Sequence, residues 1–578
     1  MDAQWGDRDR SPWPARLLAL AVALLVTGPA LGPGFVLLRD MVFVPRQDLD
    51  LDALGLGGGL PRAVPVDAAM ALVTAVVPGE LVQKAVLLGL VFAAVLGAAR
   101  LVPPDADGRR GAAAAVAGLV YGWSPYLAER LLIGQWTLLI AWAALPWIAR
   151  AGLRVRAGTP RAVPALILAC VPAALSPTGA LLAAGVVVAT CGFHRAGGPL
   201  VALLGLALPW LVAGALAPSG GVSDPAGVAA FAARAENWGG ALVAVLGTGG
   251  IWNAGAVPAG RGSGLVPLLT VLLLALAVLG WLTRDALRGA GRGLVVLGAV
   301  GVALAALGAL PGTEVVLEAA VRSVPGAGLL RDGQKWAAWW ALPLALGAGL
   351  GVRRLTGVLA DRGLAVLAGP LAGAALLLPV VAVPDLVWGV GGRLHPVAYP
   401  ADWQRVRDLL ATDEGPGDVL VLPFGAYRVF GWNDDRPQLD PAPRWLTRTA
   451  VVDDALVVDG RALAGEDVRA ARVATVLDDP AALARDGVGW VLVERGTPGR
   501  PVPASVTALP VALDGADLTL YRVPGAVDGP VPSPARVTAV VLAHACALGV
   551  LVGAVLWIAR AASTVALRRR PLRKRVTE

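Results

Sequence analysis

A single carboxylate stands where the first long apolar run of the chain meets a polar loop. Asp40 belongs to the segment RDMVFVPR (39–46), directly after that run. A carboxylate at the edge of a bilayer is costly unless it has a function or a charged partner. The spacing leaves two hypotheses open. Asp40 is either a functional group, or one half of an ion pair with Arg39, Arg46 or a basic residue of another loop.

Cations gather in two later loops beside apolar runs. Glu129 and Arg130 follow one such run, whereas Arg331 and Lys335 precede another. The chain has only three lysines, so Lys335 is unusual in this position. Arginine and lysine at a membrane boundary are suited to holding a phosphate or diphosphate head group. The alternative is that each side chain snorkels and only sets the depth of its helix.

Several common chemistries have no local support. The sequence contains no GxxxxGK[ST] phosphate loop, no HExxH and no GxSxG motif, and its histidines are His194, His395 and His544. None of the three has partners at catalytic or metal-binding spacing. ATP-driven work, a histidine metal site and a Ser-His-Asp relay are therefore not predicted, and no resident metal site is expected from the residues.

The composition predicts the elements that must position these groups. Of 578 residues, 56% are hydrophobic and 16% charged, and the mean hydropathy is +0.68. Such values exclude a disordered, collagenous or disulfide-scaffold chain and predict a polytopic, all-α membrane bundle. About twelve apolar runs approach membrane-spanning length. They lie near 17–38, 81–101, 111–123, 136–152, 162–175, 178–193, 199–216, 264–283, 293–310, 336–352, 364–383 and 536–560.

Arginine sets the predicted orientation. Basic residues concentrate in alternate connections, and the +8 net charge comes largely from them, so no nucleic-acid partner is predicted. Both termini are expected in the cytoplasm, with the protein spanning the plasma membrane many times and a basic tail at 561–578. The long segment 384–535 is then extracytoplasmic. Basic residues expected inside include Arg8, Arg10, Arg109 and Arg284.

The segment 384–535 loses the membrane composition and predicts a small α/β domain. Runs at 418–424, 456–458, 490–494 and 518–523 predict strands, and 402–411 and 479–486 predict helices. The region before it, 1–383, holds the membrane part, with an interfacial helix expected near 64–77.

The stretch 427–448 of the outer segment is too polar and aromatic to predict a strand. Aromatic rings beside amide, acid and arginine groups suit a sugar-binding surface, and the alternative is a loop packed on the membrane part. The candidate acceptor-binding residues are Glu129, Trp432, Asn433, Asp434 and Trp445.

The chain resembles the GT-C superfamily of integral membrane glycosyltransferases. The resemblance rests on the order of features along the chain. A first span is followed by an acidic residue in the first outer loop and by an interfacial helix, the spans number about a dozen in all, and an outer domain comes late in the chain. The stretches YGWSPYLAERLLIGQW (121–136) and LRDGQKWAAWW (330–340) look similar to actinobacterial membrane proteins of the arabinofuranosyltransferase group.

The resemblance implies an activity and roles for particular residues. Members use polyprenyl-phosphate sugars, here of the arabinofuranose or mannose class, and transfer the sugar to a cell-envelope glycan or glycolipid on the outer face. Asp40 would be the catalytic base, and Lys335, Arg331 and Arg130 would hold the donor phosphate. Many members carry a paired acidic motif where this chain has Arg39-Asp40, which leaves a divalent cation open as a cofactor.

Two other functions stay open at this point. A transporter or flippase of lipid-linked glycans usually needs ionisable groups inside its spans and two related halves, and the sequence shows little of either. A scaffold with a glycan-binding outer domain is the other alternative. The surroundings of Asp40 discriminate between them. An Asp40 that lines a lipid-accessible outer cavity together with Lys335 favours the enzyme, whereas an Asp40 sealed in a salt bridge, with no cavity, favours the scaffold.

Overall fold

The computed structural model describes residues 13–105, 108, 110–282 and 286–568. The predicted cytoplasmic residues Arg8, Arg10, Arg109 and Arg284, and the tail beyond Arg568, lie outside this part of the chain. A helix lies at each of the twelve expected apolar runs. These helices are α1 (Trp13–Thr27), α4 (Gly79–Leu101), α5 (Gly111–Gly122), α7 (Trp136–Arg156), α8 (Ala162–Ala174), α9 (Pro177–Cys191), α10 (Phe193–Ala215), α13 (Val266–Trp281), α14 (Ala290–Leu307), α16 (Ala337–Asp361), α17 (Ala368–Ala382) and α24 (Pro534–Arg568).

Eight helical segments in the described chain are long and apolar enough to cross a membrane. Three shorter apolar helices, α8, α9 and α13, accompany them. The predicted all-α membrane bundle is therefore confirmed as a fold, while the number of crossings stays a prediction.

The first span is shorter than its apolar run. Helix α1 ends at Thr27 and one 3-10 turn, η2 (Gly28–Leu31), follows it. The expected boundary at residue 38 is wrong, because the sequence GPALGPG (28–34) places prolines and glycines where a helix would have to continue. Residues 35–46 consequently form no helix and lie at the end of the bundle that faces the sheet.

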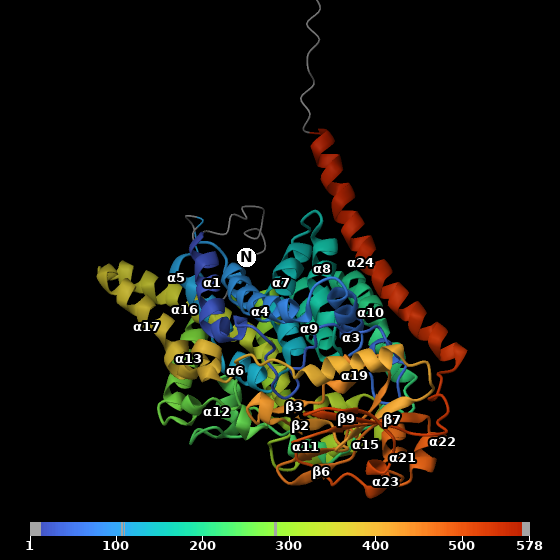
Figure 1. Cartoon of the computed structure of the whole chain (residues 1–578). Helices are drawn as coiled ribbons and strands as arrows, with labels where there is room; N and C mark the ends of the chain where they lie inside the picture. The colour runs from blue at the N-terminus through green and yellow to red at the C-terminus, as the bar shows by residue number, and fades with distance from the viewer. Residues whose placement is uncertain (1–12, 106–107, 109, 283–285, 569–578) are drawn as a thin grey trace, which may run out of the picture.

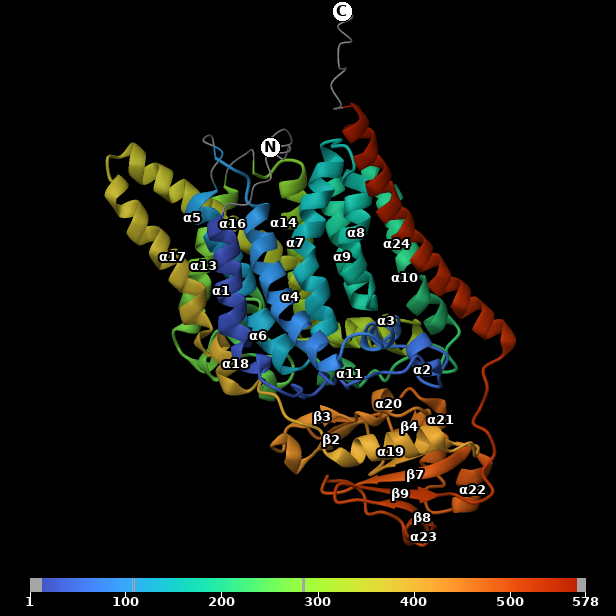
Figure 2. The ribbon, with the colours of Figure 1, turned by 45° about the horizontal axis from the view of Figure 1, so that its top comes forward.

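Several short helices lie between the bundle and the small domain within residues 384–535, which is called the outer domain after its predicted extracytoplasmic location. Helix α3 (Val66–Thr74) lies within the stretch expected to form an interfacial helix. The other short helices are α2 (Leu51–Leu54), α6 (Pro125–Leu132), α11 (Gly227–Ala230), α12 (Gly240–Leu246), α15 (Thr313–Ser323) and α18 (Val387–Gly392), and the 3-10 turns are η3 (Ala254–Ala256), η4 (Ala259–Gly262), η5 (Ala327–Leu330), η6 (Gly333–Trp336) and η8 (Pro384–Leu386). One more turn, η7 (Ala365–Leu367), joins α16 to α17. Figure 2 shows α2, α3, α11 and α18 between the bundle and the sheet.

The outer domain is built on a five-stranded sheet in the order β4-β1-β7-β9-β8. Strand β1 (Asp418–Leu422) runs parallel to β4 (Ala450–Val451) and to β7 (Val488–Glu494), whereas β9 (Leu518–Arg522) pairs antiparallel with β7 and with β8 (Val511–Asp514). A separate hairpin joins β5 (Leu456–Val458) and β6 (Arg461–Leu463). The helices are α19 (Ala401–Thr412), α20 (Ala442–Trp445), α21 (Val468–Val473), α22 (Pro480–Arg485) and α23 (Ala504–Thr507).

Most of the expected outer elements are present, but one expectation is wrong. The stretch 427–448 contains a hairpin of β2 (Tyr427–Val429) and β3 (Pro437–Leu439), with turn η9 (Gly431–Asn433). Its polar residues are compatible with strands because they are paired inside the protein. Buried Arg428 forms ion pairs with Asp440, at 2.8 Å, and with Glu494.

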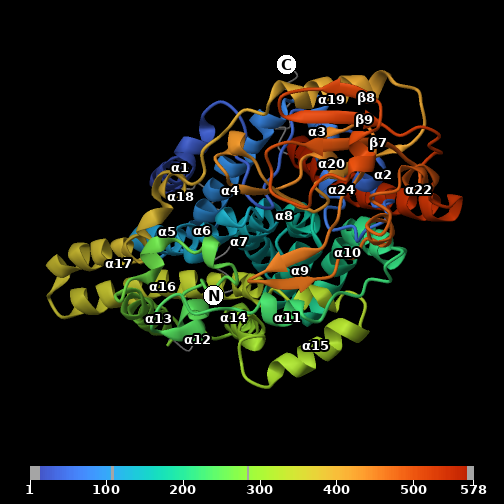
Figure 3. The same cartoon turned by 60° about the horizontal axis from the view of Figure 1, so that its bottom comes forward.

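The sheet domain lies at one end of the helical bundle. Helix α1 begins and α24 ends at the opposite end, and α24 runs along the side of the bundle past α10 and α8 (Figures 1 and 2). Figure 3, turned to bring the sheet end forward, shows α16 and α17 projecting from the bundle and α15 at its margin. The segment that carries Asp40 therefore lies where the two parts of the molecule meet.

Candidate functional site

Backbone hydrogen bonds hold the Asp40 loop between two parts of the molecule. The Arg39 N–H donates to the Pro437 carbonyl at 2.6 Å, and the Arg39 carbonyl accepts from Leu439 N–H at 2.8 Å, so the loop adds to hairpin β2–β3. On its other side, Asp40 N–H donates to the Ile133 carbonyl at 3.1 Å. Arg39 has a φ of +47°, a conformation that needs such support. The position of Asp40 is thus determined from both sides.

The Asp40 carboxyl accepts hydrogen bonds from both parts of the molecule. Tyr427 of the outer domain donates its hydroxyl to Oδ1, and Gln135 of the bundle donates Nε2 to Oδ2 at 3.3 Å. No ion pair reaches Asp40 from the described residues. Asp40 is half-buried, so no ion pair seals its carboxyl, but it lines neither the cavity beside α13 and α17 nor the cavity beside α3.

The surroundings of Asp40 favour its neutral form more than water does. Desolvation raises the pKa of Asp40 above the ordinary value, and the hydrogen bonds from Tyr427 and Gln135 and the charges of Arg130 and Arg62 oppose that rise. A carboxylate with a raised pKa is a stronger proton acceptor at neutral pH than an ordinary aspartate.

A polar chain leads from Asp40 to the later loop at 330–340. Gln135 accepts from Arg130, and Arg130 binds both oxygens of Asp332 at 2.5 and 2.9 Å. Arg130 also donates Nε to Gln334 at 2.9 Å and Nη2 to the same oxygen. The stretches 121–136 and 330–340, which sequence considerations had marked separately, are therefore joined through one guanidinium.

The role expected for Arg130 is revised by this geometry. Its five N–H groups make five hydrogen bonds, to Gln135, Asp332 and Gln334, and its side chain is fully buried. An arginine has no sixth donor, so Arg130 cannot hold a donor phosphate in this arrangement. It positions the two loops instead.

Lys335 and Arg331 differ in how much of their charge is available. Among residues 13–105, 108, 110–282 and 286–568, nothing forms a hydrogen bond or ion pair with the Lys335 ammonium, which lies 5.8 Å from the centre of the Trp336 ring, and Lys335 is 8% exposed. Arg331 is 3.3 Å from Glu466 of the outer domain and 5.7 Å from the Phe231 ring. Lys335 is thus the freer cation, and Arg331 shares its charge with Glu466.

Arg62 is a functional candidate that sequence reasoning missed. It lies 2.5 Å from Glu466 and 3.7 Å from Asp454, and 53% of its side chain is exposed. Its charge acts on both Asp40 and Tyr427. Arg62 lies in a Gly- and Leu-rich stretch with no motif, so only its tertiary partners reveal it. Gln135 and Gln334 were within the marked stretches but had not been singled out.

Glu129 lies away from any surface that an acceptor could reach. It is fully buried, and Oε2 accepts from Ile251 N–H at 3.0 Å and from Gln334 Nε2 at 3.3 Å. Burial and the neighbouring Glu236 raise the pKa of Glu129 well above the ordinary value. The expected acceptor contact is therefore replaced by a structural one.

The candidate acceptor residues of the outer domain mostly face inward. Trp445 packs on Trp403 and Tyr399, and Trp432 stacks on Phe430. Asn433 is buried, donating to Leu37 O at 3.2 Å and to Gln438 Oε1. Exposed Asp434 contacts His395 at 2.8 Å. The two alternatives for the stretch 427–448 were a sugar-binding surface and a loop packed on the membrane part. These contacts match the packed loop, and a sugar-binding surface there would need Asp434.

The Asp40 surroundings do not fit a bound divalent cation. They offer one carboxylate, an amide and a phenol, among several arginines, whereas magnesium and calcium prefer sets of oxygen ligands. Within the described chain, no group of three or more His, Cys, Asp or Glu side chains could hold a metal ion. No step of a mechanism is therefore routed through a metal here.

The fold is similar to that of a known structure. The cryo-EM structure of arabinofuranosyltransferase AftD from Mycobacteria superposes with a TM-score of 0.53 and 17% sequence identity, covering 92% of this chain and 40% of that chain. This chain thus spans well under half the length of that protein. The two chains therefore share a fold, as the resemblance to membrane transferases implied. Comparisons with protein-family descriptions and with curated proteins gave no match.

Proposed function

We propose that this protein is a membrane glycosyltransferase that moves a sugar of the arabinofuranose or mannose class from a polyprenyl-phosphate donor to a cell-envelope glycan or glycolipid. The observation that carries the proposal is the half-buried Asp40 carboxyl, which has no ion-pair partner in the described chain and is hydrogen-bonded by Tyr427 and Gln135. The fold similarity to an arabinofuranosyltransferase agrees with it.

In the proposed reaction, Asp40 takes the proton of the acceptor hydroxyl as its oxygen attacks the anomeric carbon of the donor sugar. The bond between that carbon and the phosphate oxygen breaks, and the lipid phosphate leaves with the electron pair. Tyr427 and Gln135 orient Asp40, since each donates to a different carboxyl oxygen. A phosphate is a good leaving group, so alignment, a base and a cation are what the site must supply.

Lys335 is the residue that we propose to meet the departing phosphate. Its ammonium has no partner among the described residues, whereas Asp332 and Arg130, next to it, bind each other. A cation that is unpaired before the donor arrives loses no existing contact when phosphate binds. Arg331 adds charge at the same end, shared with Glu466.

The test is transfer from labelled polyprenyl-phosphate arabinose and polyprenyl-phosphate mannose, supplied to membranes that contain the full chain. A positioned general base contributes about 10²–10⁴ in rate, so Asp40→Asn is expected to reduce transfer by that factor. Asp408→Asn is the matched control, because Asp408 is exposed on α19 and, among the described residues, its carboxyl accepts only from Gln404. Equal transfer by the wild type and Asp40→Asn would reject Asp40 as the base. Binding of a glycan without transfer would instead favour the scaffold function.

A further inference from the structure

Two arginines at the sheet end of the bundle lie together without a carboxylate partner. Arg39 precedes Asp40, and Arg393 directly follows α18, which lies beside the end of α1 (Figure 2). Both guanidiniums reach Gly255 of η3. The Arg393 Nη2 donates to the Gly255 carbonyl, and a Cβ added to Gly255 would lie 2.8 Å from Arg39 Nη2. The two positive charges therefore meet on one exposed glycine.

Most hydrogen-bond donors of these two side chains are unused. An arginine has five N–H donors. In the described chain, the Arg39 guanidinium makes one hydrogen bond, from Nη1 to the Leu132 carbonyl at 2.6 Å, and the Arg393 guanidinium makes one, to Gly255. Both acceptors are backbone carbonyls, and both side chains are half-buried. The remaining donors are free to bind a ligand.

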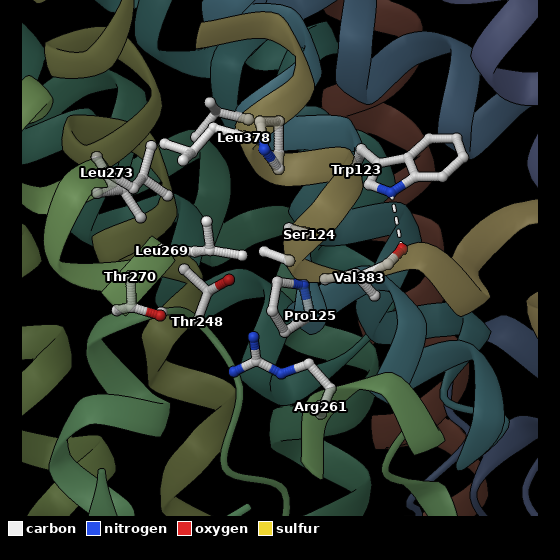
Figure 4. Close-up of a pocket in the computed structure, with 15 residues that line it drawn as sticks. Trp123, Ser124, Pro125, Thr248, Arg261, Leu269, Thr270, Leu273, Leu378 and Val383 are labelled. Carbon is white, nitrogen blue, oxygen red and sulfur yellow. Dashed lines mark hydrogen bonds between the residues drawn. The ribbon is translucent and has the colours of Figure 1, made fainter. Parts of the chain in front are cut away.

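A neighbouring arginine shows what these two lack. Arg261, which lines the cavity in Figure 4, lies 2.7 Å from Glu236. No ion pair of this kind reaches Arg39 or Arg393 from the residues that the structure describes. Burial and the charge of Arg393 lower the pKa of Arg39, yet an arginine keeps its proton in proteins. Two like charges thus stand together, and an anion between them would stabilise both.

This arginine pair lies at the boundary of the membrane part. Residues 388–391 of α18 form a left-handed turn, with φ between +52° and +71°, which is costly for Trp388 and Val390 because they are not glycines. The turn buries Val390 and leaves 61% of Trp388 exposed, close to Gly28 at the end of α1. Exposed tryptophan is typical of the head-group level of a bilayer. Arg393 therefore follows a turn that places it at that level.

We propose that Arg39 and Arg393 bind the phosphate group of a membrane phospholipid. The two non-bridging phosphate oxygens would accept from the two guanidiniums, a pairing that suits the planar fork of arginine donors. Asn253 adds a neutral donor, since its Oδ1 accepts from Gly255 N–H at 2.9 Å and its Nδ2 has no partner in the described chain.

The acyl chains of the lipid would lie against the ends of α1 and α17. Apolar side chains are exposed there, namely Leu24, Leu25, Leu377 and Val381. A free phosphate ion would gain nothing from them. The bound phosphate would also offset the repulsion between Arg39 and Arg393, and so help to hold the loop that carries Asp40. The lipid site itself does not depend on glycosyl transfer.

The experiment is native mass spectrometry of the full chain, delipidated in detergent and titrated with dioleoylphosphatidylglycerol. Arg393→Gln removes the charge and keeps an amide donor, whereas Arg393→Lys keeps the charge. Losing a hydrogen bond to a charged group should weaken binding of the first lipid about tenfold in Arg393→Gln and in Arg39→Gln, and less in Arg393→Lys. Arg405→Gln is the control, since exposed Arg405 on α19 pairs only with Asp402 in the described chain. Thermal unfolding of each variant verifies that it is folded.

Three further arms identify what is recognised and where. Dioleoylglycerol has the chains without the phosphate and is expected to bind at least tenfold more weakly, while inorganic phosphate alone is expected to compete poorly. Lys335→Met is expected to bind phosphatidylglycerol as wild type does, because the charged neighbours of Lys335 are Asp332, Arg130 and Arg331.

Each arm has a result that would contradict the proposal. Equal affinity of Arg393→Gln and wild type for phosphatidylglycerol would overturn the site. Dioleoylglycerol binding as tightly as phosphatidylglycerol would overturn the head-group assignment. Strong competition by inorganic phosphate would show a soluble-anion site and overturn the lipid assignment. Loss of binding in folded Lys335→Met would place the lipid at the proposed donor site instead.

Discussion

Replacing Tyr427 with phenylalanine tests whether Asp40 acts by taking a proton. The Tyr427 hydroxyl donates to Oδ1 and stabilises the ionised carboxylate, which lowers the pKa of Asp40. A hydrogen bond to a charged group is worth about 1.5–3 kcal/mol when fully buried. Because 36% of Tyr427 is exposed, water replaces part of the bond, and we expect a loss of about 1 kcal/mol. About 1.4 kcal/mol is a tenfold change in an equilibrium constant, so the pKa of Asp40 should rise and, at acid pH, the ionised fraction should fall about fivefold.

The sign of the effect on activity follows from the proposed role. Only ionised Asp40 can accept the proton, so transfer falls as the pH drops through the pKa of Asp40. A higher pKa places that fall at higher pH. Tyr427→Phe should therefore move the acid limb of the pH–rate profile to higher pH and lower transfer about fivefold at the acid end, with the plateau at high pH within a few-fold of wild type.

The assay is labelled-sugar transfer measured across the pH range in detergent-solubilised protein. Tyr521→Phe in strand β9 is the matched control, since Tyr521 pairs within the sheet and not with the Asp40 loop. An acid limb that stays in place, or moves downward, in folded Tyr427→Phe would show that Asp40 does not set it. A loss of activity equal at every pH would mean that Tyr427 orients Asp40 without tuning it.

Three further substitutions test the surrounding network. Lys335→Met should reduce transfer about 10–100-fold while Lys335→Arg retains more activity, since a cation remains to meet the phosphate, and the same assay measures both. Asp332→Asn leaves the guanidinium of Arg130 without its charged partner. It should therefore destabilise the protein by about 3 kcal/mol and lower the midpoint of thermal unfolding. An unchanged midpoint would contradict the positioning role of Arg130. Gly134→Ala would put a Cβ 2.3 Å from Met41 N and 2.4 Å from Leu38 O, so it should lower both the thermal midpoint and the activity, whereas Gly89→Ala, with open space around it, should lower neither.

Hydropathy was sufficient to predict the membrane part, because a membrane-spanning helix must hydrogen-bond its own backbone N–H and C=O groups and present apolar side chains to lipid. All twelve apolar runs coincide with helices. The boundary at residue 38 failed since hydropathy averages over prolines and glycines that break the helix at 28–34. The outer strands and helices were predicted by their local pattern, and Asp479 caps α22 as its position suggests, accepting from Ala481 N–H at 3.0 Å.

The partners of the site residues could not be predicted in the same way. Asp40 and Tyr427 are 387 residues apart, and Arg62 and Glu466 are 404 residues apart. No local pattern carries information about such pairs, because they exist only after the outer domain packs on the bundle. Arg130 illustrates the limit well. Its type and place suggested phosphate binding, whereas the count of its hydrogen bonds assigns it to positioning.

The outer domain is therefore part of the site and not an appendage to it. Tyr427 supplies a hydrogen bond to Asp40, and Glu466 neutralises part of Arg62 and Arg331. Hairpin β2–β3 also holds the backbone of the Asp40 loop. Without the domain, Asp40 would lose one of its two side-chain donors, and Arg62 and Arg331 would lose the carboxylate of Glu466. Since their charge would then attract any anion, the domain both orients the carboxyl and limits the positive charge at the place where we propose that phosphate departs.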